Sequence, residues 1–321
     1  MTLPRSLQNR LRLPAIGSPM FIVSDPELVL AQCRAGIIGA FPALNARPAS
    51  ELEEWLARIT AELAAERERY PGRLIAPFAV NQIVHASNER LAHDVELCVK
   101  YRVPIVITSL RPPAEVVQAV HGYGGLVFHD VINVRHARKA AEQGVDGIIA
   151  VAAGAGGHAG TLSPFALVKE IRSFWPHTLI LAGAISTGSD IVAALAMGAD
   201  LAYLGTRFIA TAEANAPDDY KRMIMDAHAD DIVYTSLFSG VLGSYLKASV
   251  ARTGLDPNAL PAGDKSKLDF GSGGNTELKA WRDIWSAGQG VGSIHDVPAV
   301  ANLVDRLEAE YRTALARLHA A

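Results

Sequence analysis

The feature that most constrains the fold of this chain is a regular alternation of short apolar runs with longer amphipathic segments. Strands buried on both faces, as in a parallel sheet covered by helices, are nearly continuous in apolar residues. Eight such runs occupy residues 14–18, 36–41, 74–80, 103–108, 125–128, 147–151, 178–182 and 201–204. Eight strands alternating with helices predict an α/β fold, a (β/α)8 TIM barrel that is complete by about residue 210.

The segments between the runs carry apolar residues at three- and four-residue spacing, which is typical of helices with one face on a core. The expected helices cover residues 25–33, 49–66, 88–99, 114–121, 134–143, 164–173 and 188–197. One of them starts with Ser24-Asp25-Pro26, and a capping side chain followed by proline is a common helix start. A doubly wound open sheet is the alternative arrangement of the same elements.

The alternation stops after residue 211, and the rest of the chain predicts a smaller unit. Residues 216–230, 232–253 and 277–287 look helical, and residues 256–276 form a connection rich in Pro, Gly and Ser. We expect residues 211–285 to make a small helical cover over the mouth of the barrel. A long amphipathic helix at 297–319 then packs back, so that residues 286–321 complete the domain formed by residues 1–210.

Charge and composition exclude several classes of protein. The 321-residue chain has a formal net charge of −3 at pH 7 without the clustered basic excess of a nucleic-acid surface. Polar residues interrupt every apolar run before membrane-spanning length, and residues 1–14 lack the apolar stretch of a signal peptide. Cys33 and Cys98 are the only cysteines, and no paired Cys or His spacing points to a metal. We therefore expect a cytoplasmic protein without nucleic-acid, membrane or metal binding.

The strongest functional signal is the run Gly154-Ala155-Gly156-Gly157-His158-Ala159, directly after the strand expected at 147–151. Glycine lets a backbone approach a flat ligand closely, because it has no Cβ and tolerates positive φ. His158 adds a side chain that exchanges a proton near neutral pH. The run also fits the loose dinucleotide fingerprint of Rossmann folds, but the next strand ends without the acidic residue that binds ribose. We predict a flavin site with His158 as the proton-transfer group.

Other strand ends supply further candidate ligand contacts. In barrels, phosphate often binds between the loops after strands seven and eight, which here carry Gly183 and Gly205-Thr206. A planar heterocycle also needs a few polar groups around its edge, and the remaining strand ends offer Met20, Asn81, Gln82, Ser109, His129, Asp130 and Asn133. Asn133 equally suits a helix cap for residues 134–143.

With these pieces assembled, the chain resembles the nitronate monooxygenase family, whose members are FMN-containing (β/α)8 enzymes related to flavin-dependent quinone and enoyl-thioester reductases. The resemblance is carried by Ser18-Pro19-Met20, Ser24-Asp25-Pro26-Glu27-Leu28, Ala76-Pro77-Phe78-Ala79-Val80-Asn81, Ala155-Gly156-Gly157-His158-Ala159-Gly160, Gly183, Gly205-Thr206 and Gly288-Gln289-Gly290. It implies FMN contacts from Met20, Asn81, Gly156, Gly157, Gly183, Gly205 and Thr206, and we add His129, Asp130, Gln289 and Gly290 to the expected contacts. It also implies that His158 is the catalytic base or proton-transfer group.

Several positions depart from the pattern of the family, four of them at or near the ends of barrel strands. Val151 and Gly154 stand where many members have Gln and Glu, Asp130 stands where a Lys is common, and Tyr203 replaces a frequent Gln. An acid in place of a cation near the flavin pyrimidine edge disfavours the anionic reduced flavin by charge repulsion. A protonated His129 would compensate for this charge.

The resemblance implies a small-molecule substrate, an alkyl nitronate, whose electrons pass to the flavin and then to molecular oxygen. Three alternatives stay open at this point. The first is an NAD(P)H-dependent reductase of quinones or enoyl thioesters, the second a non-catalytic flavin-binding protein, and the third a flavin-free phosphate-binding barrel. The sequence does not give the oligomeric state, and a homodimer is compatible with it.

Overall fold

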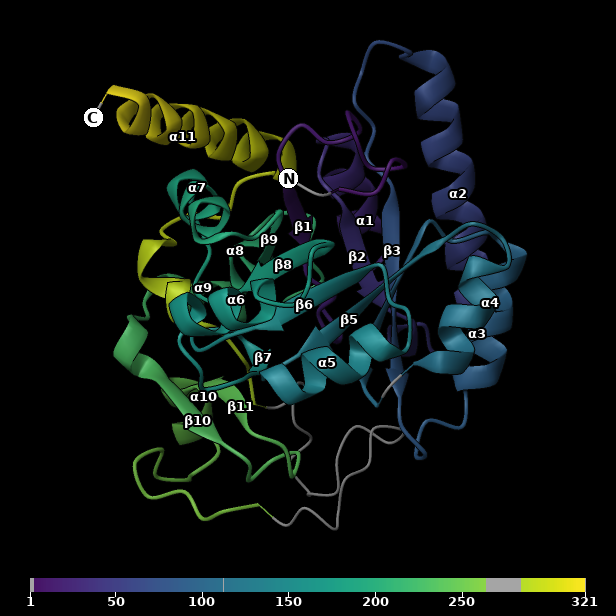
Figure 1. The fold of residues 1–321 in the computed structure, drawn as a ribbon. Helices are drawn as coiled ribbons and strands as arrows, with labels where there is room; N and C mark the ends of the chain where they lie inside the picture. The colour runs from purple at the N-terminus through teal and green to yellow at the C-terminus, as the bar shows by residue number, and fades with distance from the viewer. Residues whose placement is uncertain (1–2, 112, 264–283, 321) are drawn as a thin grey trace.

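The eight predicted apolar runs form the parallel strands of one barrel (Figure 1). The computed structural model describes residues 3–111, 113–263 and 284–320. The barrel strands are β1 (Ala15–Gly17), β2 (Gly39–Pro42), β3 (Phe78–Val84), β4 (Ile105–Leu110), β5 (Leu126–Val131), β6 (Gly147–Val151), β8 (Thr178–Ala182) and β9 (Leu201–Leu204). They pair in the order β1-β9-β8-β6-β5-β4-β3-β2, and a parallel bridge between Ile16 and Ile38 joins β1 to the residue preceding β2. This closure confirms the (β/α)8 barrel and excludes the open doubly wound sheet.

Helices cover the outside of the barrel in the order that the sequence predicts. They are α1 (Pro26–Arg34), α2 (Glu51–Arg69), α3 (Leu91–Lys100), α4 (Ala114–His121), α5 (Val134–Glu142), α6 (Pro164–Arg172), α7 (Gly188–Met197) and the short α8 (Thr206–Ile209). Asp25 caps α1 by accepting the backbone N–H of Leu28 at 3.1 Å. Asn133 caps α5 by accepting the N–H of His136 at 2.9 Å, so its side chain has the structural role that the sequence left open.

Side chains of each barrel strand alternate between the interior and the layer under the helices. Phe128 of β5 belongs to the interior cluster, whereas Val127 on the same strand packs in the outer cluster. Since the side-chain period of a strand is two residues, Asp130 shares the face of Phe128 and points into the barrel. His129 shares the opposite face and points toward the helices.

The last helix, α11 (Val300–Ala320), packs against α7 and α1 and lies at the end of the barrel away from the β10–β11 hairpin described below (Figure 1). It buries Val300, Leu303, Val304 and Leu307. At the start of α7, a Cβ on Gly188 would lie 2.1 Å from the carbonyl oxygen of Leu307, so only glycine allows this close approach.

The segment after the barrel differs from the prediction, because the helix expected at 232–253 is wrong. It contains an antiparallel hairpin of β10 (Ile232–Thr235) and β11 (Gly243–Leu246), followed by the short helix α10 (Lys247–Ala251). β11 also pairs with β7 (Gly157–His158), which makes a three-stranded sheet. Pairing with a strand more than 80 residues earlier, through Gly243↔His158 and Ser244↔Gly157, decides this structure, and local periodicity carries no information about such a partner.

The other predictions for this segment have mixed outcomes. The helix expected at 216–230 is the shorter α9 (Asp218–Met225), and a 3-10 turn, η2 (Ala229–Asp231), follows it. Most of the helix expected at 277–287 lies outside the described residues. Residues 285–287 have no regular structure, and a second 3-10 helix, η4 (Gln289–Ser293), follows them.

Within the described residues, no helix is both long and apolar enough to cross a membrane. The same part of the chain shows no group of three or more His, Cys, Asp or Glu side chains placed to hold a metal ion. Cys33 and Cys98 are buried free thiols, and burial raises the pKa of each to about 12.

Candidate functional site

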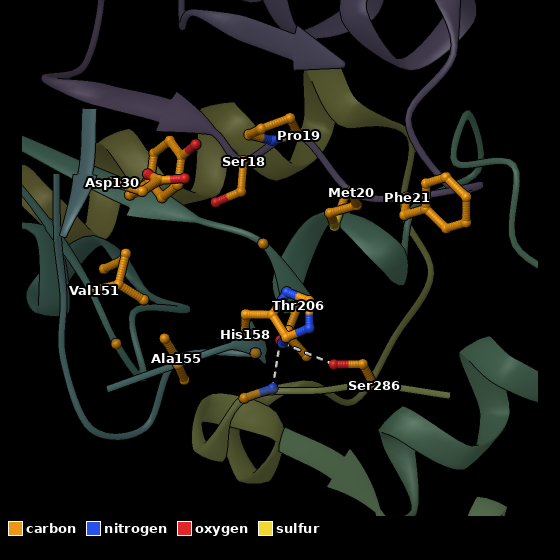
Figure 2. Close-up of a pocket in the computed structure, with 18 of the residues that line it drawn as sticks. Ser18, Pro19, Met20, Phe21, Asp130, Val151, Ala155, His158, Thr206 and Ser286 are labelled. Carbon is orange, nitrogen blue, oxygen red and sulfur yellow. Dashed lines mark hydrogen bonds between the residues drawn. The ribbon is translucent and has the colours of Figure 1, made fainter. Parts of the chain in front are cut away.

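A cavity of about 830 Å³ opens at the carboxyl ends of the barrel strands (Figure 2). Parallel barrels place the loops that bind ligands at this end. The cavity lining includes ten of the predicted site residues: Met20, Asn81, Asp130, Gly156, Gly157, His158, Gly183, Gly205, Thr206 and Gly290. Residues that come from seven separate segments of the chain therefore meet at one site.

Four of the candidate contacts, Gln82, His129, Asn133 and Gln289, do not line this cavity. His129 is only 3% exposed on the outer face of β5, where its Nδ1 lies 2.8 Å from Oγ1 of Thr108. Burial lowers the pKa of His129 to about 4, so the imidazole is neutral at pH 7 and does not compensate for the charge of Asp130. The side chain of Gln289 is exposed, and its backbone N–H donates to the carbonyl of Gly154 at 2.9 Å.

The loops after β8 and β9 form a concave backbone surface. Gly183 has φ of +142°, and a Cβ there would lie 2.7 Å from the carbonyl oxygen of Ala153, so glycine is required. Among the described residues, no hydrogen bond takes up the backbone N–H groups of Gly183, Gly205 or Thr206. Three free amides, two of them at the start of the short helix α8 and one in the loop after β8, are a suitable cradle for an anion.

Hydrogen bonds fix the glycine-rich loop after β6 against the segment before η4. The N–H of Gly157 donates to Oγ of Ser286 at 2.8 Å (Figure 2). That hydroxyl donates to the carbonyl of Ser244 at 2.6 Å. The N–H of Gly288 donates to Oγ1 of Thr206 at 2.8 Å. A Cβ on Gly156 would lie 2.9 Å from the nitrogen of Gly288, so these two backbones touch.

His158 lies at the end of β7, where its backbone pairs with Gly243 of β11. Its Nε2 is 2.9 Å from Oγ of Ser239, in the loop between β10 and β11. Because that hydroxyl donates to the carbonyl of Val241 at 3.0 Å, we assign Nε2 of His158 as the donor to Ser239. Burial lowers the pKa of His158 to about 4, so the ring is neutral at pH 7. The hairpin that replaced a predicted helix thus positions the candidate catalytic side chain.

The floor of the cavity is polar and comes from four neighbouring positions inside the barrel. Nδ2 of Asn81 donates to Oγ of Ser109 at 2.9 Å, and Ser109 donates to Oδ2 of Asp130 at 2.7 Å. Burial raises the pKa of Asp130 to about 6. Tyr203 also lines the cavity, and burial together with the nearby charge of Asp130 raises the pKa of its hydroxyl well above the ordinary value.

The loop that carries Met20 is held by Asn45, which the sequence analysis missed. Nδ2 of Asn45 donates to the carbonyls of Met20 at 3.0 Å and Ser24 at 2.8 Å, and its Oδ1 accepts the N–H of Ile22 at 2.9 Å. Asn45 follows β2 at its carboxyl end, so a search of every strand end for polar residues would have found it.

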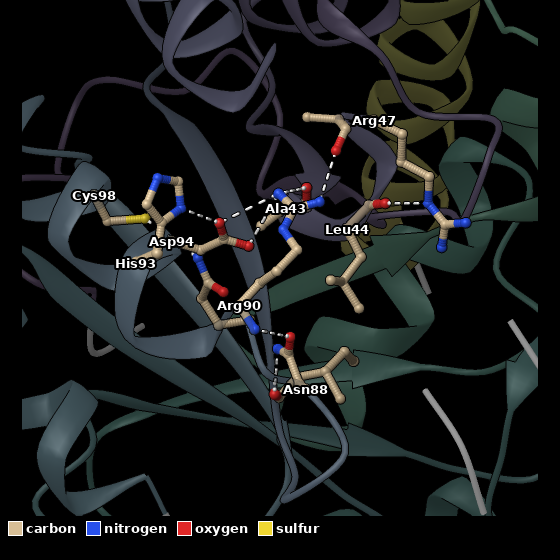
Figure 3. A network of polar contacts seen from close by, with 11 residues as sticks. Ala43, Leu44, Arg47, Asn88, Arg90, His93, Asp94 and Cys98 are labelled. Carbon is tan, nitrogen blue, oxygen red and sulfur yellow. Dashed lines mark hydrogen bonds and ion pairs between the residues drawn. The ribbon is translucent and has the colours of Figure 1, made fainter. Parts of the chain in front are cut away.

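A polar network behind this loop holds Asn45 in turn (Figure 3). Arg90 donates to the carbonyl of Ala46 at 2.7 Å and to that of Ala43 at 3.3 Å, on either side of Asn45. The fully buried carboxylate of Asp94 accepts from Arg90 at 3.2 Å. This ion pair ties α3 to η1 (Ala43–Asn45) and so to the cavity wall.

The lining has an unusual charge composition. Of its described residues, Asp130 is the sole acid, and none is Lys or Arg. The remaining titratable side chains are His136, His158, Tyr203 and Tyr220. Burial and the nearby Arg135 and Lys139 lower the pKa of His136. Within the described lining, the groups that can donate to a bound anion are therefore backbone amides and hydroxyl groups.

Comparison with known proteins gives consistent matches. The family described as nitronate monooxygenase matches residues 11–310. A nitronate monooxygenase of Paraburkholderia phytofirmans is 29% identical over 95% of this chain and 94% of its own length. The crystal structure of a nitroalkane oxidase from Streptomyces ansochromogenes superposes with a TM-score of 0.77 at 26% identity and covers 97% of this chain and 99% of its own. FabK from Thermotoga maritima has a TM-score of 0.76 at 21% identity, with 99% of both chains covered, and shows the same fold.

Proposed function

Because the chain belongs to the nitronate monooxygenase family, a family of flavin-dependent oxidoreductases, we propose that it binds FMN and oxidises alkyl nitronates with molecular oxygen. The observation that carries the proposal is the meeting, in one cavity, of a backbone anion cradle and a neutral histidine. The cradle suits the phosphate of FMN, and His158 suits proton transfer beside a small substrate.

The residues present fit FMN. The unused amides of Gly183, Gly205 and Thr206 offer donors to a phosphate, and no cationic side chain is needed for this. Apolar side chains such as Met20, Val151 and Ala155 offer contacts to the face of a flat ring. Bound FMN would supply the two-electron redox chemistry, and the protein would bind, orient and manage protons.

His158 is the proposed proton-transfer group. Since its imidazole is neutral at pH 7, it can accept a proton from a bound substrate and hold that proton beside the substrate. An anionic nitronate beside the ring would favour the protonated imidazole and raise its pKa. Ser239 positions the ring through the bond to Nε2.

We further propose that the chain works as two units, a barrel of residues 1–210 completed by residues 286–321 and a cover of residues 211–285. The β10–β11 hairpin within that cover contributes Ser239, Gly240, Val241 and Leu242 to the cavity lining. The cover therefore takes part in forming the substrate side of the site.

The test is the visible spectrum of the purified protein, recorded anaerobically before and after an alkyl nitronate is added. A bound flavin that bleaches with nitronate, together with oxygen consumption in air, is the expected result. A flavin that stays oxidised with nitronate but bleaches with NAD(P)H would replace this proposal by a reductase of quinones or enoyl thioesters. A protein that binds no FMN would refute the proposal altogether.

A further inference from the structure

The cavity floor carries a buried carboxyl group for which the proposed function gives no role. Oδ2 of Asp130 accepts one hydrogen bond, from Ser109, and its Oδ1 has no hydrogen-bond partner among the described residues. The hydroxyl of Tyr203, a residue that is only 8% exposed, likewise has none in the described part of the chain. Both side chains line the same cavity. Two buried polar atoms without a hydrogen-bond partner, on residues that line one cavity, indicate that a proton or a ligand contact completes this place.

Among the described residues that line the cavity, no Lys or Arg is placed to balance a charge here. The groups that face Asp130 across the floor are the neutral side chains of Asn81, Ser109 and Tyr203. From the cavity wall, His136 and His158 both have pKa values lowered by burial. His129, its neighbour in the chain, is neutral at pH 7 and points away. Within the described lining, additional negative charge therefore has protonation rather than a Lys or Arg side chain to neutralise it.

Two-electron reduction of a bound flavin adds such a charge when a single proton accompanies the two electrons. We propose that Asp130 is the proton-holding group of the cavity, taking up a second proton whenever the bound flavin is reduced and releasing it on reoxidation. This inference rests on the FMN part of the proposed function. The electrons come from the nitronate, and both protons come from the substrate or water. One proton joins the flavin and the other joins the carboxyl of Asp130.

The surroundings of the carboxyl support this role. Its burial already raises its pKa to about 6 without additional charge nearby, and a new negative charge raises it further. There is thus a pH range, beginning near pH 6, in which the carboxyl is ionised while the flavin is oxidised and protonated while the flavin is reduced. Ser109 keeps its hydrogen bond to the side chain in both forms, because a protonated carboxyl still has an acceptor oxygen.

The midpoint potential of the bound flavin measures this proton directly. For a two-electron couple, a tenfold change in an equilibrium constant corresponds to about 30 mV, so each proton taken up contributes about 30 mV per pH unit. With two protons per two electrons, the potential falls by about 60 mV per pH unit wherever the carboxyl is ionised beside oxidised flavin and protonated beside reduced flavin. With one proton, it falls by about 30 mV per pH unit.

The experiment is a spectroscopic redox titration with dithionite of the FMN-loaded protein, its Asp130→Asn variant and a His129→Gln control. Asparagine keeps the shape of Asp130 and the acceptor for Ser109 but cannot hold the proton. We expect about 60 mV per pH unit for the wild type and the control, and about 30 mV for Asp130→Asn. Equal slopes for wild type and Asp130→Asn would overturn the proposal.

An infrared difference spectrum between reduced and oxidised protein identifies the holder of the proton. A carboxylic C=O band that grows on reduction and is missing in Asp130→Asn is the expected result. A slope that changes without such a band would mean that the second proton sits on the flavin, which overturns the role of Asp130. If Asp130→Asn does not fold, Ser109→Ala serves instead. In the wild type the hydrogen bond from Ser109 lowers the pKa of Asp130, so its loss should raise the pH at which the steeper slope begins.

These readouts separate the two proposals. The redox titration needs bound FMN but no turnover, so a protein inactive toward nitronates still tests Asp130. A nitronate oxidase with equal slopes would leave the proposed function intact and reject only this inference.

Discussion

Removal of the Asn45 side chain should loosen the Met20 loop, and the structure gives the size of the effect. Asn45→Ala deletes three hydrogen bonds, to the Met20 carbonyl, the Ser24 carbonyl and the Ile22 N–H. A typical intramolecular hydrogen bond contributes about 1 kcal/mol net. Ile22 is 37% exposed, so water replaces its bond, whereas Ser24 is fully buried. The two carbonyl bonds therefore make the expected loss about 2 kcal/mol in the free energy of unfolding.

Urea denaturation measures this loss as a lower midpoint concentration of urea, with an unchanged dependence of the unfolding free energy on urea concentration. Asn45→Asp is the sharper variant, because it keeps the acceptor for Ile22 but turns a carboxylate toward the two carbonyl oxygens. We expect it to be at least as destabilising as Asn45→Ala. Asn258→Ala, on an exposed loop, is the matched control and should change stability by less than about 0.5 kcal/mol.

Asn45→Ala and Asn45→Asp should also weaken FMN binding, since Met20 is a proposed contact and its loop loses the hydrogen bonds that hold it. Titration of the apoprotein with FMN measures the dissociation constant. If Asn45→Asp matched the wild type in both stability and FMN affinity, the argument that Asn45 holds this wall of the cavity would be refuted.

The other predictions concern single side chains of the site and its surroundings. His158→Asn should lower kcat for nitronate about 10²- to 10⁴-fold while FMN stays bound, and full activity would contradict a role in proton transfer. Gly183→Ala should cost about 1–3 kcal/mol and weaken FMN binding, whereas Gly124→Ala, at φ +83° with no atom near its Cβ, should cost stability without touching FMN. Because burial lowers the folded-state pKa of His129 from 6.5 to about 4, the unfolded chain binds its proton first and stability falls as pH drops through this window. Between pH 7 and pH 5, the free energy of unfolding of His129→Gln should therefore fall by about 2 kcal/mol less than that of the wild type. Equal decreases for the two proteins in urea denaturation would show that His129 does not cause the pH dependence.

Much of the barrel could be predicted from local pattern. Parallel strands covered on both sides are apolar throughout, and the helices that cover them carry one apolar stripe, so both leave a periodic signature. Caps such as Asp25 are equally local, because they bond to a residue three positions away. Most of the cavity residues were also predictable. Once the strand ends are known from local pattern, closure of the barrel brings the carboxyl ends of all strands together.

The predictions that were wrong or missing concern features that depend on contacts between residues far apart in the sequence. The β10–β11 hairpin exists because β11 pairs with β7, and that pairing also holds His158. His129 and Asp130 are neighbours in sequence, yet one residue of register places them on opposite faces of β5. Asn45 was missed because its partners lie more than 20 residues away and its own neighbourhood shows only a turn.

The barrel, the glycine-bearing loops at its carboxyl end and the histidine among them could all be predicted from residue type and spacing along the chain, because these fix periodicity, turn chemistry and titratable groups. The face that each strand-end side chain takes depends on the packed structure. So does the lining in which Asp130 lies with no Lys or Arg among the described residues. Burial, and with it the direction of every pKa shift in the site, arises from the atoms that packing brings around a group, and these come from all parts of the chain.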